Sequence, residues 1–571
     1  LKLRAAAPSL AQPRAMQRAW LREFNALGLQ LRPQAAKLVT DFLQVCPDPQ
    51  HTAEVLVEHT KSYLRSHRGV VEAIIDADVI KAVIACMVDA QSGEGNLGLG
   101  GDAMDTHAAV NQGITAKDLG DGVQVYNVMT DVVPFDYSVA TKSWAASHEK
   151  PTLFPGPNTK AKIYSDRYYM LLQRLLSEGK FVMEANTASQ GLLSHQRKLT
   201  PVASLGGNPG RKTVFGLISR IRDDTARRWS IEDMQKVYDL DLELTQSDRL
   251  ITDGSFVLAE GMLQGDTFKV SQLDSPDAVP REISMSKDTI PRQAFGGNLT
   301  DEQLRTLEVH EPENQDGMYV VLCEVHLDNV RVLEKLDALF QGYEEVSPPV
   351  AYVFMGSFCS EAFVPTAEGV KSYREGFERL KFKLGRLSRH VESGTRFIFI
   401  PGPRDPGAQT LPRMPLTGYL TSNLEKDIPR VVMATNPCRV RHFTKELVFF
   451  RHDVLRLLRR HEVISLRDPD MGGAPSAQHV RNEMVRFLLD QAHLVPLPLE
   501  ESNILWSFDH TLRLYPLPQA VFVGGVSQPF DCAYQQCNFS SVGPFHRDAS
   551  FYAYHPVKEE LESCEVPDKA G

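Results

Sequence analysis

Residues 351–360, with the sequence AYVFMGSFCS, most constrain how this chain folds. The run is apolar until Gly356, which is the pattern of a buried β-strand that ends at a tight turn. In α/β proteins, the loops after such strand ends carry the binding and catalytic groups. This loop contains Ser357, Cys359 and Ser360 but no acidic residue. We therefore expect a sheet whose functional-site position lacks the charge that catalysis needs.

The composition sets broad limits. The chain has 571 residues, so we expect two to four domains. Hydrophobic residues make up 42% and charged residues 23%, which is typical of a soluble globular protein. No apolar run approaches the roughly 20 residues that span a membrane, so no membrane partner is expected. The net charge of −10 argues against gripping nucleic acid as the main role. The cysteines include no CxxC pair, so neither a zinc finger nor a disulfide framework is indicated.

The N-terminal part reads as a separate helical domain. Met16, Trp20, Phe24 and Leu27 recur at the spacing of one helix face, and further apolar stripes follow. A Gly-rich polar stretch then begins at residue 91. We expect a helical domain over residues 1–90 and a flexible linker over residues 91–122.

The next part predicts a small β-barrel after a connecting segment. Tyr238, Leu240, Leu242 and Leu244 alternate with acidic residues, which indicates a strand with one wet face. Residues 256–263 and 267–273 form a hairpin pattern around Gly265, and short strands of this kind suit an OB-fold. We expect the barrel over residues 206–300 and a connector packing on it over residues 123–205. The acidic strand favours a structural or protein-binding barrel, with single-strand DNA binding as an alternative.

Residues 301–571 alternate between strand and helix patterns. Apolar strands are predicted at 317–325, 350–355 and 396–400, with amphipathic helices at 329–340 and 370–387 between them. Such alternation predicts a sheet covered by helices. The expected fold class is therefore a multidomain α+β protein.

The predicted strand ends can be compared with the motifs of two-metal phosphoesterases. Two cations about 4 Å apart need a bridging carboxylate, neutral imidazoles and a side-chain amide while they activate a water. The corresponding positions in this chain are Glu324, His326, Ser357, Pro403, Asp405, His493, Gly525 and Ser527.

The residues at these positions oppose an enzyme. The bridging carboxylate, the amide and two imidazoles are missing, and Arg404 adds a positive charge. No Gly-x-Ser-x-Gly elbow surrounds Ser357 or Ser360. We expect no catalytic residue, no cofactor and no two-metal centre. The sequence leaves open whether one weak metal site is present. A metal-dependent phosphoesterase is the alternative function.

Several longer stretches carry a family resemblance. They are LREFNALGLQLRPQAAKLVTDFLQ at 21–44, FVLAEGMLQGDTFKV at 256–270, AFGGN at 294–298, LCEVHLDNVRVLEKLDALFQGY at 322–343, FIPGPRDPG at 399–407, TNPCRVRHFTKELVFFR at 435–451, QAHLVPLPL at 491–499 and LRLYPLPQAVFV at 512–523. In these stretches the chain resembles the B-subunits of eukaryotic replicative DNA polymerases, and most closely those of DNA polymerase epsilon. The resemblance covers nearly the whole chain and is weakest at the linker.

The resemblance implies a fold and a role. It implies an N-terminal domain similar to the lid of AAA+ ATPases, an OB-fold and a calcineurin-like phosphoesterase domain (an α/β sandwich) without its metal site. It also implies a nuclear, non-catalytic scaffold subunit in DNA replication. The implied partners are the C-terminal zinc-binding region of the DNA polymerase epsilon catalytic subunit, the GINS complex of the replicative helicase, and small histone-fold subunits. Contact with DNA is expected to be weak or indirect.

Overall fold

The chain divides into two compact units, residues 1–106 and residues 107–571. The computed structural model describes short stretches between residues 30 and 83, and residues 122–567 apart from 139–140, 148, 185–195, 208–209, 222–227, 246, 287–291, 298, 468–474 and 526–527. In the first unit, β1 (Gln30–Leu31) pairs in parallel with β2 (Ile74–Ile75), and residues 34–39 are helical. Most of the expected helical domain, and residues 91–121 of the expected linker, lie outside the described residues.

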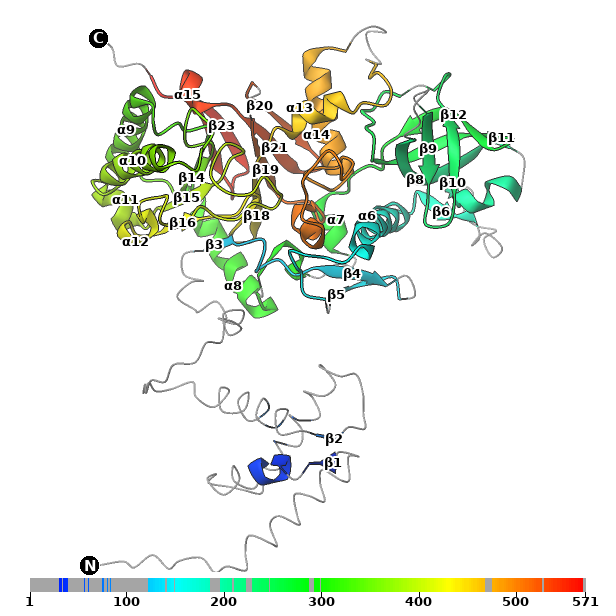
Figure 1. The fold of residues 1–571 in the computed structure, drawn as a ribbon, viewed down its shortest axis with the longest axis horizontal. Helices are drawn as coiled ribbons and strands as arrows, with labels where there is room; N and C mark the ends of the chain where they lie inside the picture. Colours follow the sequence, from blue (N-terminus) through cyan, green and yellow to red (C-terminus); the bar gives the residue numbers. More distant parts are fainter. Residues whose placement is uncertain are drawn as a thin grey trace, which may run out of the picture. The chain divides into compact units, whose positions relative to one another are not determined.

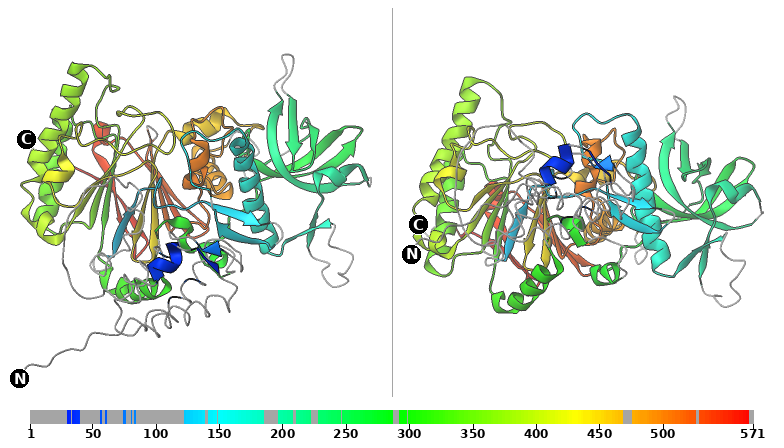
Figure 2. Two further views of the ribbon diagram at one scale, coloured as in Figure 1. Left: turned by 60° about the horizontal axis from the view of Figure 1, so that its bottom comes forward. Right: turned by 90° about the horizontal axis from the view of Figure 1, so that it is seen from below.

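Two six-stranded sheets form the centre of the second unit (Figures 1 and 2). The first sheet has the spatial order β16 (Val431–Met433), β15 (Arg396–Ile400), β14 (Ala351–Met355), β13 (Tyr319–Cys323), β22 (Ser550–His555) and β23 (Glu560–Glu565). The first four strands run parallel, and β22 and β23 are antiparallel additions at one edge. Strands β13 and β14 are buried along their whole length, as expected where both faces of a parallel sheet are covered.

The second sheet combines strands from distant parts of the chain. Its spatial order is β20 (Phe530–Tyr534), β21 (Cys537–Val542), β19 (Ala520–Gly524), β18 (Lys445–Arg451), β17 (Cys438–His442) and β3 (Val123–Tyr126). Strands β18, β19 and β21 are parallel to one another, while β20, β17 and β3 pair antiparallel with their neighbours. Residues of both sheets, among them Val353 and Phe449, share one buried cluster, so the sheets pack face to face.

Helices cover the outer faces of both sheets, which gives four layers. On the first sheet lie α9 (Val330–Glu345), α10 (Ala367–Leu384), α11 (Ser388–Ser393) and α12 (Leu424–Asp427). On the second lie α13 (Val454–Arg460), α14 (Ala477–Asp490) and the 3-10 helix η5 (Trp506–Leu512). Helix α10 shows how the sequence builds a layer. Thr366 caps its first turn by accepting a hydrogen bond from the Gly369 amide over 3.1 Å, and Tyr373, Phe377 and Leu384 bury one face.

A closed five-stranded barrel lies to one side of the sandwich (Figure 1). Its strands are β8 (Lys212–Ile221), β9 (Arg228–Glu232), β10 (Val237–Asp241), β11 (Phe256–Gln264) and β12 (Thr267–Asp274). The barrel closes because β8 pairs with both β9 and β11, and β10 pairs in parallel with β12. This is the strand order of an OB-fold, so the prediction of that fold is confirmed.

The barrel differs from the expectation in detail. Strand β10 ends at Asp241, and Leu244 is 87% exposed rather than facing the core. The acidic face is partly neutralised, because Arg228 pairs with Asp239 and the Lys269 ammonium lies 3.9 Å from an Asp241 oxygen. Two of the acidic side chains on this strand are thus near a basic partner.

The segment expected as a connector, residues 123–205, contributes elements to both the barrel and the sandwich. Helix α6 (Asn158–Ser177) shares a buried cluster with barrel strands, and β6 (Phe181–Met183) and β7 (Arg197–Leu199) extend the barrel sheet from β8. Strand β3 instead completes the second sheet of the sandwich by pairing with β17. The remaining elements are β4 (Phe135–Ser138), β5 (Ser143–Ala146), η2 (Val202–Gly207), α7 (Arg281–Met285), η3 (Arg292–Phe295), α8 (Asp301–His310), η4 (Glu311–Asn314) and α15 (Phe545–Asp548).

Two arginines, the buried Arg174 and the partly buried Arg249, join the barrel to the sandwich. Arg174 of α6 donates to the Pro276 carbonyl over 2.7 Å and also to the Asp490 carbonyl. Arg249, in the loop between β10 and β11, pairs with Glu483 and Asp490 of α14. No helix of the described part is long and apolar enough to cross a membrane.

Candidate functional site

The parallel strands β13, β14 and β15 end at one edge of the first sheet, and the residues that follow them meet there. Glu324 follows β13, Gly356 and Ser357 follow β14, and Arg404 and Asp405 follow β15. The Glu324 amide donates to the Met355 carbonyl over 2.8 Å, and the Gly356 amide donates to the Ile400 carbonyl over 2.8 Å. Parallel register thus brings together residues that lie far apart in the sequence, as expected for this class of sheet.

Glu324 is the centre of this group and is completely buried. Its Oε1 accepts hydrogen bonds from Arg451 Nε over 3.1 Å and from the Ser357 amide over 3.1 Å. Its Oε2 lies 3.1 Å from His326 Nε2 and accepts a further hydrogen bond from Arg404 Nη2. Two guanidinium groups therefore bind the carboxylate, one on each oxygen.

Arg451 enters the group from the second sheet and connects several strand ends. It is the last residue of β18 and its side chain is 1% exposed. Nε donates to the Gly356 carbonyl over 2.7 Å, and Nη1 donates to the Gly524 carbonyl over 3.1 Å and to Asp453 Oδ1 over 3.1 Å. Its positive charge lies between the ends of β14 and β19.

Arg404 approaches from the solvent side. Its side chain is 37% exposed, and Nη1 donates to the Ser360 carbonyl over 2.6 Å. Its Nη2 reaches both the Glu324 carboxylate and His326 Nε2, the latter at 3.0 Å. The positive charge of Arg404 thus lies against Glu324 and His326.

Asp405 keeps its carboxylate but uses it inside the protein. Oδ1 accepts from the Phe358 amide over 2.8 Å and from the Tyr373 hydroxyl over 3.1 Å, while Oδ2 accepts from the Gly402 amide over 2.7 Å. Complete burial raises the pKa of Asp405 to about 6, and these hydrogen bonds only partly oppose that rise. The carboxylate therefore supports the loops rather than facing a ligand.

Glu324 shows the opposite behaviour. Desolvation alone would raise its pKa, but the hydrogen bond with His326 and the charge of Arg451 hold the pKa well below its usual range. Glu324 is therefore a permanent anion at neutral pH, and its charge is balanced by Arg404 and Arg451.

Two imidazoles complete the group. The rings of His326 and His546 stack with their centroids 4.0 Å apart and an angle of 13° between their planes. His546 belongs to α15, and its Nδ1 lies 3.3 Å from the Glu324 carbonyl oxygen. Burial, followed by the charge of His326, lowers the pKa of His546. Within the described residues, ligand atoms of Glu324, His326 and His546 all lie within 4.8 Å of one another.

The structure does not bring His493 to this group, which corrects its placement at the fourth motif position. His493 follows α14, where its Nε2 lies 3.2 Å from Arg167 Nη2 and 3.3 Å from Asp509 Oδ1. Burial, followed by the charge of Arg167, lowers the pKa of His493 to about 4. Motif order along the chain suggested the position, but packing against α6 and η5 determines where the side chain lies.

Of the remaining predicted positions, Pro403 and Gly525 are described, and neither side chain offers a ligand atom. The Pro403 carbonyl accepts from Gln409 Nε2 over 2.6 Å, and the Gly525 amide donates to the Val542 carbonyl over 3.3 Å. Ser527 lies outside the described residues.

Sequence reasoning missed three residues near the site, namely Arg451, His546 and Asn436. The Asn436 amide nitrogen donates to the Pro401 carbonyl over 3.0 Å and to the Arg451 carbonyl over 2.8 Å. Asn436 also accepts a hydrogen bond from the Arg451 amide over 3.0 Å. Asn436 follows a short apolar strand, which is a pattern that the sequence shows. No short motif surrounds Arg451 or His546.

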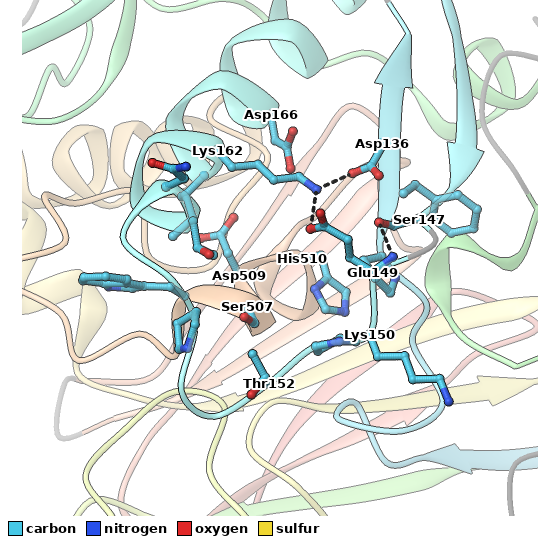
Figure 3. Close-up of a pocket in the computed structure, with 18 of the residues that line it drawn as sticks. Asp136, Ser147, Glu149, Lys150, Thr152, Lys162, Asp166, Ser507, Asp509 and His510 are labelled. Carbon is cyan, nitrogen blue, oxygen red and sulfur yellow. Dashed lines mark hydrogen bonds and ion pairs between the residues drawn. The ribbon is translucent and has the colours of Figure 1, made fainter. Parts of the chain in front are cut away.

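A separate pocket of about 590 Å³ lies between the β4–β5 hairpin, α6 and η5 (Figure 3). Lys162 Nζ lies 2.9 Å from Asp136 Oδ1 and 3.6 Å from Glu149 Oε2, and Arg513 donates to Asp166 over 3.1 Å. Because these charges pair across the pocket wall, they fasten the hairpin and η5 to α6.

Comparisons with known proteins agree with the architecture. The family model for the B-subunits of DNA polymerases alpha and epsilon matches residues 319–532, within the sandwich. The model described as the OB-fold domain of DNA polymerase epsilon subunit 2-like proteins matches residues 157–277. That second region includes α6, β6 and β7, so it begins earlier than the barrel boundary expected from the sequence.

Individual relatives extend the similarity over most of the chain. The chain is 31% identical to the B-subunit of DNA polymerase epsilon from Arabidopsis thaliana, over 76% of this chain and 81% of the relative. It is 27% identical to DNA polymerase epsilon subunit 2 of Mus musculus, over 95% of this chain and 97% of the relative. Among solved structures, a novel archaeal phosphodiesterase is 9% identical with a TM-score of 0.24, covering 44% of this chain and 99% of that one.

Proposed function

Because the chain belongs to the family of DNA polymerase epsilon B-subunits, we propose that it is a non-catalytic scaffold that binds the C-terminal zinc-binding region of the catalytic subunit. The observation that carries the non-catalytic part is the environment of Glu324. Two guanidinium groups bind its carboxylate at the strand ends where a phosphoesterase would hold metal ions.

The chemistry of the site supports this proposal. Two-metal hydrolysis needs an open cation that activates a water and a bridging carboxylate that holds the second cation. Ser357 stands where that carboxylate is needed, and its amide serves as a donor to Glu324. An arginine cannot lose a proton in a protein, so neither guanidinium can act as a general base. The sandwich is accordingly an inactive phosphoesterase-like domain.

The way the barrel and the sandwich are joined in the second unit supports a role as a binding platform for another subunit. Buried ion pairs and hydrogen bonds from Arg174 and Arg249 fix the barrel to the sandwich, so both parts present one rigid surface. A permanent subunit contact buries on the order of 2,000 Å² or more around an apolar centre. A rigid two-part platform suits such a contact, because little conformational entropy is lost when the partner binds.

The wider assignment follows the family resemblance. In this proposal the chain works in the nucleus during DNA replication and links the polymerase to GINS and the replicative helicase, alongside small histone-fold subunits. DNA contacts are weak or indirect, since the net charge is −10 and basic residues on the barrel pair with acidic neighbours.

Co-expression tests the partner. The full chain is produced together with the C-terminal region of a DNA polymerase epsilon catalytic subunit and analysed by size-exclusion chromatography. We expect one co-eluting complex that persists in moderate salt, because an apolar contact is little screened. The catalytic domain of the same large subunit, in place of its C-terminal region, is the control and should elute separately. Separate elution of the C-terminal region at micromolar concentration would refute the proposal.

An activity assay tests the non-catalytic assignment independently. Purified chain with Mn²⁺ and a phosphodiester model substrate should release no more product than a Glu324→Gln variant. Activity that disappears on this substitution would show that the strand ends are catalytic after all.

A further inference from the structure

The residues at the strand ends do not fit two metal ions, but three of them fit one. A carboxylate with two imidazoles is a common ligand set for a divalent transition metal ion such as Zn²⁺. Glu324, His326 and His546 supply that set, with ligand atoms that lie within 4.8 Å of one another. His326 and Glu324 come from the end of β13, whereas His546 comes from α15 and matches none of the phosphoesterase motifs.

Arg404 occupies the place that such an ion would take. Its Nη2 donates to Glu324 Oε2 and lies 3.0 Å from His326 Nε2, so one nitrogen contacts two of the three ligand residues. A metal ion bound there would have to displace this nitrogen, because the ion and the guanidinium would both contact Glu324 Oε2 and His326 Nε2. A guanidinium at this distance would also repel a dication strongly.

We propose that Arg404 acts as a built-in cation that closes a single-metal site formed by Glu324, His326 and His546. The guanidinium balances the buried carboxylate and keeps divalent transition metal ions out. Arg451 does not play this part, because it contacts Glu324 Oε1 together with the carbonyls of Gly356 and Gly524. It would remain in place while Oε2 and both imidazoles bind the ion.

The surroundings allow the site to open. Arg404 is 37% exposed, so removing its side chain leaves access for water and a metal ion rather than a closed cavity. Metal bonds to nitrogen and oxygen are about 2.0–2.2 Å long, so ligand atoms must approach to roughly 4 Å or less. His546 is exposed on the surface. A small turn of its ring supplies that approach while the Glu324 and His326 side chains stay where the sheet holds them.

The test is Co²⁺ binding to the full chain, followed by the visible absorption of the bound ion. We expect the Arg404→Ala variant to bind one additional Co²⁺ at least about tenfold more tightly than any site in the wild-type chain. The absorption should indicate nitrogen and oxygen ligands, and Zn²⁺ should displace the Co²⁺. Arg379→Ala removes the same charge from an exposed position on α10 and should leave Co²⁺ binding unchanged.

A second substitution identifies the ligands. In the Arg404→Ala background, His546→Ala should return Co²⁺ binding to the wild-type level, and thermal unfolding should show that both variants remain folded. Two results would overturn the proposal. One is an Arg404→Ala variant that is folded but binds Co²⁺ no more tightly than the wild type. The other is binding that survives the loss of His546.

Discussion

Arg249 lies between the barrel and the sandwich, and its replacement by methionine measures how firmly they are joined. Nε donates to Glu483 Oε2 over 3.2 Å, Nη2 pairs with Asp490, and Nη1 lies 3.4 Å from Asp274 and 3.2 Å from Asp277. The side chains of Asp490 and Glu483 are only 0% and 3% exposed. Methionine preserves most of the volume but leaves both carboxylates without this partner.

The size of the expected loss in stability depends on the hydrogen bonds that those carboxylates retain without Arg249. Removing one partner of a buried ion pair costs about 3–5 kcal/mol. Asp490 still accepts from the Ala278 amide over 2.7 Å and from the Tyr534 hydroxyl over 3.0 Å. Burial already raises the pKa of Asp490 to about 6, so without Arg249 the carboxyl can take up a proton instead of staying charged. We therefore expect a loss near the lower limit, about 3 kcal/mol in the free energy of unfolding.

Urea denaturation of the full chain, followed by tryptophan fluorescence, gives that free energy. The matched control is Arg220→Met, at an exposed position on the barrel strand β8, which should change stability by less than about 0.5 kcal/mol. In an Asp490→Asn background the cost of Arg249→Met should fall by more than about 1 kcal/mol, because the two residues interact directly. A loss below about 1 kcal/mol for Arg249→Met, or an unchanged loss in that background, would refute the reasoning.

Three further substitutions test individual parts of the structure. Asp405 has a raised pKa of about 6, so its contribution to stability is greatest at low pH and is lost as pH rises through 6. The stability of wild type relative to Asp405→Asn should therefore fall by about 3 kcal/mol between about pH 4 and pH 7, and a constant difference in urea titrations would contradict this. Gly524→Ala would place a methyl group 2.7 Å from Cys323 Sγ and should lower the free energy of unfolding by about 1–3 kcal/mol, whereas an unchanged urea midpoint would show that the site has room. Phe399→Ala, in the core under α10, should lower the free energy of unfolding by about 3–5 kcal/mol. The control Phe382→Ala, at a side chain that is 69% exposed, should lower it by less than about 0.5 kcal/mol. Equal urea midpoints for the two variants would contradict the assigned layers.

Much of the fold could be predicted because its signals are local. The apolar runs at 351–355 and 396–400 are β14 and β15, and the apolar stripe from Tyr373 to Leu384 is the buried face of α10. The hairpin pattern around Gly265 is β11 and β12 of the barrel. Each pattern reflects the period of a single element and needs no knowledge of its neighbours.

The candidate site could be predicted only in part. Glu324, Ser357 and Asp405 lie at one edge of the first sheet, because each follows a parallel strand and parallel strands end at one edge. His493 does not join them, since it packs against Arg167 and Asp509 on the outer layer of the second sheet. The order of motifs along a chain carries no information about which layer a loop enters, so this assignment was wrong.

The sequence by itself determined the elements, the barrel and the lack of a bridging carboxylate at Ser357. Only the tertiary structure decided that Arg451 and Arg404 bind Glu324, and that β3 completes a sheet whose other strands lie far later in the chain. The physical reason is that strand and helix periods come from backbone geometry within a few residues. Ion pairs between distant residues such as these depend on how the elements pack, because packing decides which charges come into contact.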